Sequence, residues 1–167
     1  METIEQQFLK QIESHKGLLY KLSKLYMDTE VDREDLFQEM VFQLWRSYAT
    51  FEGKSLFSTW MYRVALNTAL VFVKKEKKKL KGEELTDRID AVEYSDHEQK
   101  EEQLAYFYRA VHELNAIEKA LIFLFLEGQS HRQIGVQLGI SEGNARVKLN
   151  RTKDKLQDII KKQGYEF

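Results

Sequence analysis

The sequence contains neither cysteine nor proline among its 167 residues. Without cysteine there is no disulfide framework and no thiolate metal site. Proline breaks helix interiors but is common in loops and in first helical turns. A chain of this length without proline therefore favours an all-α protein.

Long apolar runs are also lacking. No run reaches the roughly 18 residues that a membrane span needs. The N-terminal segment METIEQQFLKQIESHK has no continuous apolar stretch of the kind found in secretory signals. Hydrophobic residues make up 43% of the chain and charged residues 32%, so cores can form beneath a charged surface. We expect a soluble, cytoplasmic protein with one ordinary domain or two small helical ones.

The net charge of −1 averages over segments of opposite sign. A basic block is formed by Lys74, Lys75, Lys77, Lys78, Lys79 and Lys81, opposed only by Glu76. Acidic residues dominate from Glu83 to Glu102, and the final segment is basic again. This segregation carries more information about partners than the net charge does.

Helical periodicity divides residues 1–80 into three predicted helices joined by short connections. The first spans about Ile4 to Tyr26. The second carries a broad apolar stripe that consists of Val31, Leu36, Phe37, Met40, Val41, Leu44, Trp45 and Tyr48. Ser55 is predicted to cap the third, which runs to about Lys79. Its core candidates include Leu56, Trp60, Val64 and Ala65.

Residues 81–99 are polar, acidic and aperiodic, which indicates a linker. The second domain, 100–167, begins with one helix and an almost wholly apolar one over 120–126, which Gly128 closes. Ser130 and Gln133 form a capping box for a short helix, and Ser141 caps a last helix that runs to about Lys162. The predicted fold is all-α, with two small helical domains joined by an acidic linker.

The stretch Gln129 to Lys153 has the anatomy of a helix-turn-helix unit, whose second helix reads the major groove. That helix offers Asn144, Arg146, Lys148, Asn150, Arg151 and Lys153. Arginine can bind guanine, and asparagine can bind adenine, through paired hydrogen bonds, while lysine usually contacts phosphate. An ordinary basic helix on the protein surface would carry a similar charge. DNA binding is favoured because this stretch also supplies the small core that a helix-turn-helix needs. That core consists of Ile134, Leu138, Ile140, Ala145 and Leu149.

A second nucleic-acid site is predicted in the first domain, where aromatic and cationic residues interleave. The residues are Phe51, Lys54, Trp60, Tyr62, Arg63 and Asn67. Rings can stack on unpaired bases while cations meet phosphates, and an extruded base can be held in a pocket. The alternative places Phe51 and Trp60 in the core, which we favour for Trp60, and treats Arg63 and Asn67 as an ordinary polar face.

A third feature is the polar face of the second helix, where Asp35, Gln38 and Glu39 lie close together. These side chains could dock on a basic protein surface. Capping and solubility explain them equally well, so the residues alone leave both interpretations open.

Taken together, these motifs resemble the extracytoplasmic-function (ECF) group of bacterial sigma factors. The resemblance lies in the segments 32–39, 51–67 and 128–153. It implies that Asp35, Gln38 and Glu39 bind core RNA polymerase. It further implies that Phe51 and Asn67, with Arg63 nearby, hold a flipped non-template base of the −10 element. Arg146, Lys148, Asn150 and Arg151 would meet the −35 duplex.

Three positions depart from the family pattern. Leu114-Asn115-Ala116 lacks the proline common at the start of the buried helix, Val147 replaces a small polar residue, and Val71 follows the Asn67 turn where some members have a second polar residue. The resemblance implies promoter recognition at initiation without enzymatic activity or a cofactor. It also implies control by an anti-sigma factor.

Two other classes remain as alternatives. A stand-alone helix-turn-helix regulator would bind a palindromic duplex without polymerase, but it has no need for the aromatic and basic face of the first domain. A helical hydrolase or metalloenzyme is disfavoured, because the scattered histidines lack metal-ligand spacing. These are His15, His97, His112 and His131.

Overall fold

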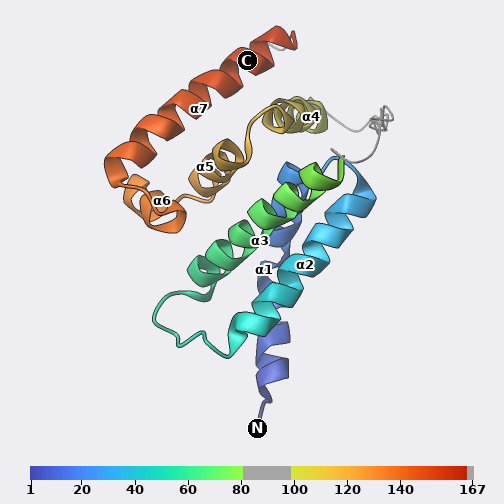
Figure 1. The fold of residues 1–167 in the computed structure, drawn as a ribbon, viewed down its shortest axis with the longest axis vertical. Coiled ribbons are helices and arrows are strands. Elements are labelled where there is room, and N and C mark those ends of the chain that lie inside the picture. Colours follow the sequence, from blue (N-terminus) through green and yellow to red (C-terminus); the bar gives the residue numbers. More distant parts are fainter. Residues whose placement is uncertain (81–98, 165–167) are drawn as a thin grey trace. The chain divides into compact units, whose positions relative to one another are not determined.

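The computed structural model describes residues 1–80 and 99–164, and every element in these two ranges is an α-helix (Figure 1). The chain divides into two compact units, residues 1–86 and 87–167. The prediction of an all-α protein with two helical domains is confirmed. The predicted linker over 81–99 lies, except for Gln99, outside the described residues.

The first unit contains α1 (Ile4–Tyr26), α2 (Glu30–Tyr48) and α3 (Phe57–Leu80), and each helix packs against the other two. Thr3 begins α1 with a capping box that includes Gln6, and the Thr29 side chain caps α2 by accepting from the Asp32 N–H. The buried residues recur at helical spacing, so each helix turns one apolar face inward. They include Leu19, Leu22, Leu36, Met40, Leu44, Met61 and Ala65.

The start of α3 differs from the prediction. Ser55 does not cap it, because its hydroxyl donates to the Leu56 carbonyl (3.3 Å). That carbonyl accepts the first helical bond, from the Trp60 N–H (3.2 Å). Leu56 thus stands just before the first turn, where its side chain is 76% exposed instead of in the core.

Two residues of the predicted α2 stripe also lie outside the core, Trp45 at 43% exposure and Val31 at 69%. Val31 precedes the buried Leu36 by five residues, a spacing that puts the two side chains on nearly opposite faces of a helix. The predicted apolar stripe of α2 therefore began one turn too early.

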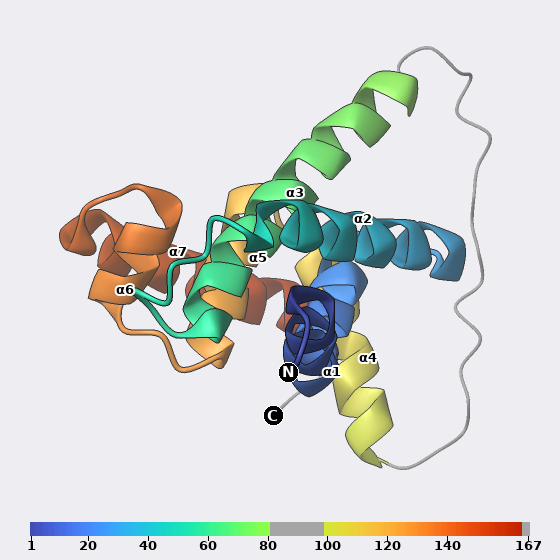
Figure 2. The same ribbon diagram turned by 90° about the horizontal axis from the view of Figure 1, so that it is seen from below.

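The second unit contains α4 (Gln99–His112), α5 (Ala116–Leu126), α6 (His131–Leu138) and α7 (Glu142–Lys162), shown from two directions in Figures 1 and 2. Residues 120–124 of α5 are buried as predicted, whereas Phe125 and Leu126 are exposed. The Ser130–Gln133 capping box and the Ser141 cap are both confirmed. Gly128 follows α5 with a φ of 80°, a value that favours glycine.

Asn115 begins α5 in place of the proline that the family pattern led us to look for. Its side chain accepts from the Glu118 N–H (2.9 Å), and the Glu118 carboxylate accepts from the Asn115 N–H (3.0 Å). Lys155 on α7 also donates to that carboxylate (2.9 Å). Burial of the Glu118 carboxyl opposes its ionisation, but the two hydrogen bonds outweigh burial and lower its pKa. One glutamate thus caps α5 and ties it to α7.

Glu118→Gln should lower the free energy of unfolding by about 1 kcal/mol at neutral pH, because the variant loses the charge that strengthens both hydrogen bonds. Because the pKa of Glu118 is lower in the folded than in the unfolded protein, the ionised carboxylate stabilises the fold fully above the unfolded-state pKa of about 4.3. This stabilisation is lost as the pH falls through the folded-state pKa. Urea unfolding followed by circular dichroism should therefore show the difference at pH 7 and little of it near about pH 3. The exposed Glu113 supplies the control variant Glu113→Gln, and an equal loss at both pH values would contradict the assignment.

Candidate nucleic-acid interfaces

The second unit contains the predicted helix-turn-helix. In it α6 is followed by Gly139 with a φ of 70°, and Ser141 then caps α7. Ile134, Ala145 and Leu149 are fully buried between the two helices, while Leu138 and Ile140 are half-buried. The short core is therefore present, and it fixes the angle at which α7 leaves the turn.

Gly135 is a structural residue that the sequence analysis missed. A Cβ added to it would lie 2.7 Å from the Ile140 carbonyl oxygen, so α6 and the turn touch through backbone alone. A glycine inside a helix lowers the stability of the helix. Its presence in the sequence therefore indicated that the backbone is closely approached at this position.

Five of the six residues predicted to read the −35 duplex are exposed on α7. They are Asn144, Arg146, Lys148, Asn150 and Arg151. The sixth, Lys153, is half-buried, and its Nζ lies 3.8 Å from the centre of the Phe125 ring on α5. Lys153 therefore already makes a cation–π contact within the unit.

Arg146 is the most constrained of the exposed residues. Its Nε donates to His131 Nδ1 on α6 (3.4 Å), and its Nη2 lies 3.6 Å from a carboxylate oxygen of Glu142 on α7. The guanidinium is thus held between two helices. In the sequence, His131 is only one of four scattered histidines without metal-ligand spacing.

In the first unit, an aromatic cluster surrounds the loop before α3. It consists of Tyr48 at the end of α2, Phe51 in the loop, and Phe57 and Trp60 in the first turn of α3. The centre of the Phe51 ring lies 5.1 Å from that of Trp60 and 5.9 Å from that of Phe57. Phe51 and Trp60 are both half-buried. They are therefore packed together, as the core interpretation expected, while keeping part of each ring accessible for stacking.

Trp60, Arg63 and Asn67 follow one another at spacings of three and four and so share one face of α3. Arg63 and Asn67 are exposed on it. Phe51 reaches this face through its contact with Trp60. Within residues 1–80, no hydrogen bond or ring contact joins Asn67 to Phe51 or to Lys54, whose ammonium pairs with Glu52 (2.8 Å) at the exposed loop.

The same face continues into the basic block. Lys74 and Lys78 follow Asn67 by seven and eleven residues, which keeps them in its row, and both are exposed. Lys79 points elsewhere and lies 3.8 Å from Glu76. Figure 2 shows this end of α3 extending beyond α2. A polar and basic strip therefore runs along α3 from Arg63 to Lys78, interrupted by the exposed Val71.

On α2, Asp35 and Gln38 are exposed, and Glu39 is half-buried where it accepts a hydrogen bond from Gln43 Nε2 (3.0 Å). Phe42 follows Gln38 by one turn and is 55% exposed. Sequence analysis had not singled it out. An acidic and polar row beside an exposed ring can dock a basic protein surface that also offers apolar contact.

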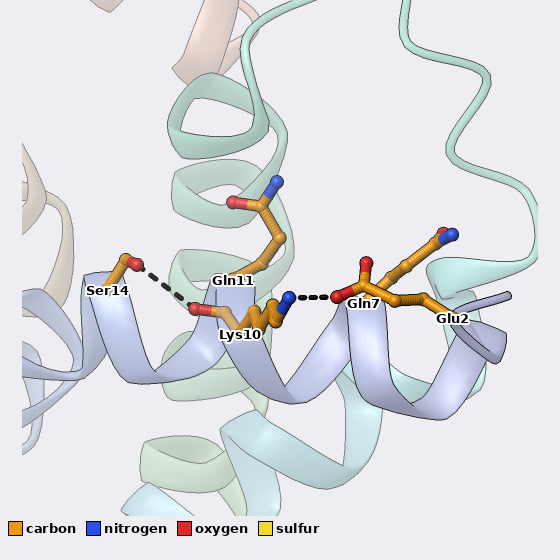
Figure 3. A pocket seen from close by; sticks show the side chains of 5 residues that line it. All are labelled: Glu2, Gln7, Lys10, Gln11 and Ser14. Atoms are coloured by element: carbon orange, nitrogen blue, oxygen red, sulfur yellow. Dashed lines mark hydrogen bonds and ion pairs between the residues drawn. The ribbon is translucent and has the colours of Figure 1, made fainter.

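One shallow hollow of about 260 Å³ lies at the start of α1 and is lined by Glu2, Gln7, Lys10, Gln11 and Ser14 (Figure 3). Its polar groups bind one another, since Lys10 pairs with Glu2 and the Ser14 hydroxyl donates to the Lys10 carbonyl (3.0 Å). In the described ranges, no group of histidines and carboxylates could hold a metal ion. None of the helices found there is both long and apolar enough to cross a membrane.

Comparison with known proteins gives two matches to models of one family. The model for Sigma-70 region 2 matches residues 11–79, and the model for Sigma-70 region 4 matches residues 104–156. The first covers the aromatic cluster and the α3 strip, and the second covers the helix-turn-helix.

Similar proteins include the ECF RNA polymerase sigma factor SigE of Mycolicibacterium smegmatis, which is 26% identical over 93% of this chain and 62% of its own length. The ECF RNA polymerase sigma factor SigX of Bacillus subtilis is 25% identical over 89% of this chain and 80% of its own. The chain thus spans about three fifths of the SigE sequence.

Among solved structures, the sigma factor RpoE of Bartonella quintana, in complex with the anti-sigma factor NepR, has the same fold. It aligns with a TM-score of 0.71 and 19% identity over 93% of this chain and 97% of that one. Both region models match in order along the chain, and the curated relatives are ECF factors. The chain therefore belongs to the sigma-70 family, and within that family to its extracytoplasmic-function group.

Proposed function

We propose that this protein is an alternative sigma factor, which directs RNA polymerase to specific promoters and assists their opening. The observation that carries the proposal is that one chain exposes two different polar and basic faces, one on α7 with the chemistry to bind duplex DNA and one on α3 with the chemistry to bind unpaired strand. The chain itself would catalyse no reaction. Because polymerase works in the bacterial cytoplasm, we place the protein there.

Each unit takes one part of this function. We assign the −35 duplex to the second unit, with Arg146 and Asn150 facing base edges and Lys148 and Arg151 facing phosphates. Asn144 lies one turn before Lys148 and can reach either. Lys153 would have to leave the Phe125 ring to take part.

The −10 element is assigned to the first unit. The exposed part of Phe51 offers a stacking surface for an unpaired base, and Asn67 offers an amide that can pair with a base edge. Arg63 and Lys54 are cations placed near the strand. Core polymerase would dock on α2 through Asp35, Gln38 and Glu39, with Phe42 beside them.

Joining the two surfaces on one polymerase makes the second contact intramolecular, so two weak interactions give one strong and position-sensitive one. The acidic sequence between the units would keep that segment off the DNA by charge repulsion. An anti-sigma factor is the expected regulator, by analogy with the Bartonella quintana protein, whose structure includes one.

Run-off transcription with purified core polymerase tests the proposal. The full chain is added to core enzyme and a pool of genomic fragments, and promoter-specific products are sequenced. We expect products from a bipartite promoter, and poor binding of the free protein to the same DNA. Tight binding of the free protein to a palindromic duplex, without promoter-specific products, would instead favour a stand-alone regulator.

The α3 strip gives a prediction of its own. Changing both Lys74 and Lys78 to glutamine should reduce the salt dependence of promoter binding by the polymerase complex. Each lost phosphate contact lowers the slope of log affinity against log salt by about 0.9, so the pair should lower it by roughly 2. Promoter choice should stay the same, because phosphates carry no sequence.

Lys77→Gln with Lys79→Gln is the matched control, since it removes the same charge from other faces of α3. If the two double variants lower the salt slope equally, the lysines act only through net charge and the strip has no role. Filter binding or fluorescence anisotropy across a salt series gives both slopes.

A further inference from the structure

Arg146 is held in place before any DNA is present. One of its partners, Glu142, lies one turn earlier on the same helix. The other, His131, is the first residue of α6 and stands fifteen positions away in sequence. Surface ion pairs taken singly contribute little to stability. The pair of contacts therefore calls for a reason beyond stability.

The chemistry of the contacts defines how the guanidinium is presented. Arginine has five N–H donors in a planar fork and no acceptor. His131 accepts from Nε, which requires an imidazole with its Nδ1 unprotonated. Glu142 faces one Nη2 donor. Among the described residues, Nη1 has no hydrogen-bond partner and Nη2 has only the 3.6 Å ion pair with Glu142. Both can therefore donate in parallel, and two parallel donors are what the O6 and N7 atoms of guanine accept.

We propose that His131 is a positioning residue for promoter recognition, which fixes Arg146 so that its terminal amino groups meet a guanine in the −35 duplex end-on. This inference rests on the proposed −35 role of Arg146. His131 itself touches no base in this arrangement. It lowers the cost of ordering a long side chain on binding, and it selects one of the ways in which the arginine fork can face the groove.

The test uses the full chain bound to core polymerase, with a panel of promoters in which each −35 base pair is changed in turn. His131→Ala should weaken binding to the preferred promoter by about three- to tenfold, the cost of ordering one freed side chain. It should also flatten the preference at one base pair, the same one that Arg146→Ala flattens. His131→Asn places an amide oxygen near the position of Nδ1 and should restore most of the preference.

Two measurements separate positioning from a direct DNA contact. The salt slope should be unchanged in His131→Ala, because no phosphate contact is removed. In the Arg146→Ala background, His131→Ala should have no further effect, because the residue it positions is gone. A slope reduced by about 0.9, or an additive loss in the double variant, would overturn the proposal.

Failure of the proposal and failure of the underlying function give different results. If Arg146→Ala changes no base preference, the −35 assignment of Arg146 is wrong and positioning falls with it. If Arg146→Ala flattens one position but His131→Ala leaves every preference intact, only the positioning role is wrong. Circular dichroism of each variant checks that α6 and α7 remain folded.

Discussion

Gly135→Val is expected to destabilise the helix-turn-helix by about 3 kcal/mol, at the upper end of the cost of overpacking a well-packed site. The reason is the backbone contact described above. Even a Cβ would lie 2.7 Å from the Ile140 carbonyl oxygen, and valine adds two methyl groups where nothing but backbone can move. Gly135→Ala should cost less, about 1 kcal/mol, because a small shift of the turn relieves a single methyl group.

Hydrogen exchange of the backbone amides in α6 and α7 measures this loss locally, in the full chain. Gly143→Ala is the control, and it should raise the stability instead of lowering it. Gly143 lies in the first turn of α7 with nothing within 4 Å of an added Cβ, so alanine should stabilise α7 by about 0.5 kcal/mol. Unchanged protection of α6 in Gly135→Val would show that the turn can move away freely.

Asp35→Lys should weaken binding to core polymerase by roughly a hundredfold, which corresponds to about 3 kcal/mol for opposing like charges at an interface. Asp35 is exposed on α2 beside Gln38, so the change should leave the fold of the first unit intact. Co-purification with core enzyme, followed by a competition titration, measures the affinity.

The control for this variant reverses an exposed charge elsewhere in the first unit. Glu13 on α1 has a side chain that is 72% exposed, in an ion pair with Lys16. Glu13→Lys makes the same change in net charge away from α2. If both variants lose polymerase equally, long-range charge is responsible and the docking face on α2 is not needed.

The elements that sequence predicts well are those decided locally. Ser130 and Ser141 are followed at once by the residues that make them caps, so a few positions fix both helix starts. The predicted Ser55 cap was wrong because the start of α3 is not decided locally. Serine at this position suits a cap, but the burial of Phe57 decides where α3 begins, and that burial depends on α1 and α2.

Contacts between distant positions leave no local pattern. The Lys155–Glu118 pair joins residues 37 apart and the Arg146–His131 pair residues 15 apart, so neither could be predicted from spacing. The candidate site residues could be named from the sequence because asparagine and arginine that share a helix face follow a simple period. How tightly each is held is a property of the folded unit.

The aromatic cluster before α3 has a practical consequence. The chain has two tryptophans, and both belong to the first unit, with Trp60 half-buried against Phe51. Indole emission responds to changes in its immediate surroundings, so capture of an unpaired base on these rings would alter the light emitted by Trp60. Binding of duplex by α7 involves no indole. Intrinsic fluorescence therefore offers a label-free optical signal for promoter melting, recorded separately from the anchoring of the complex.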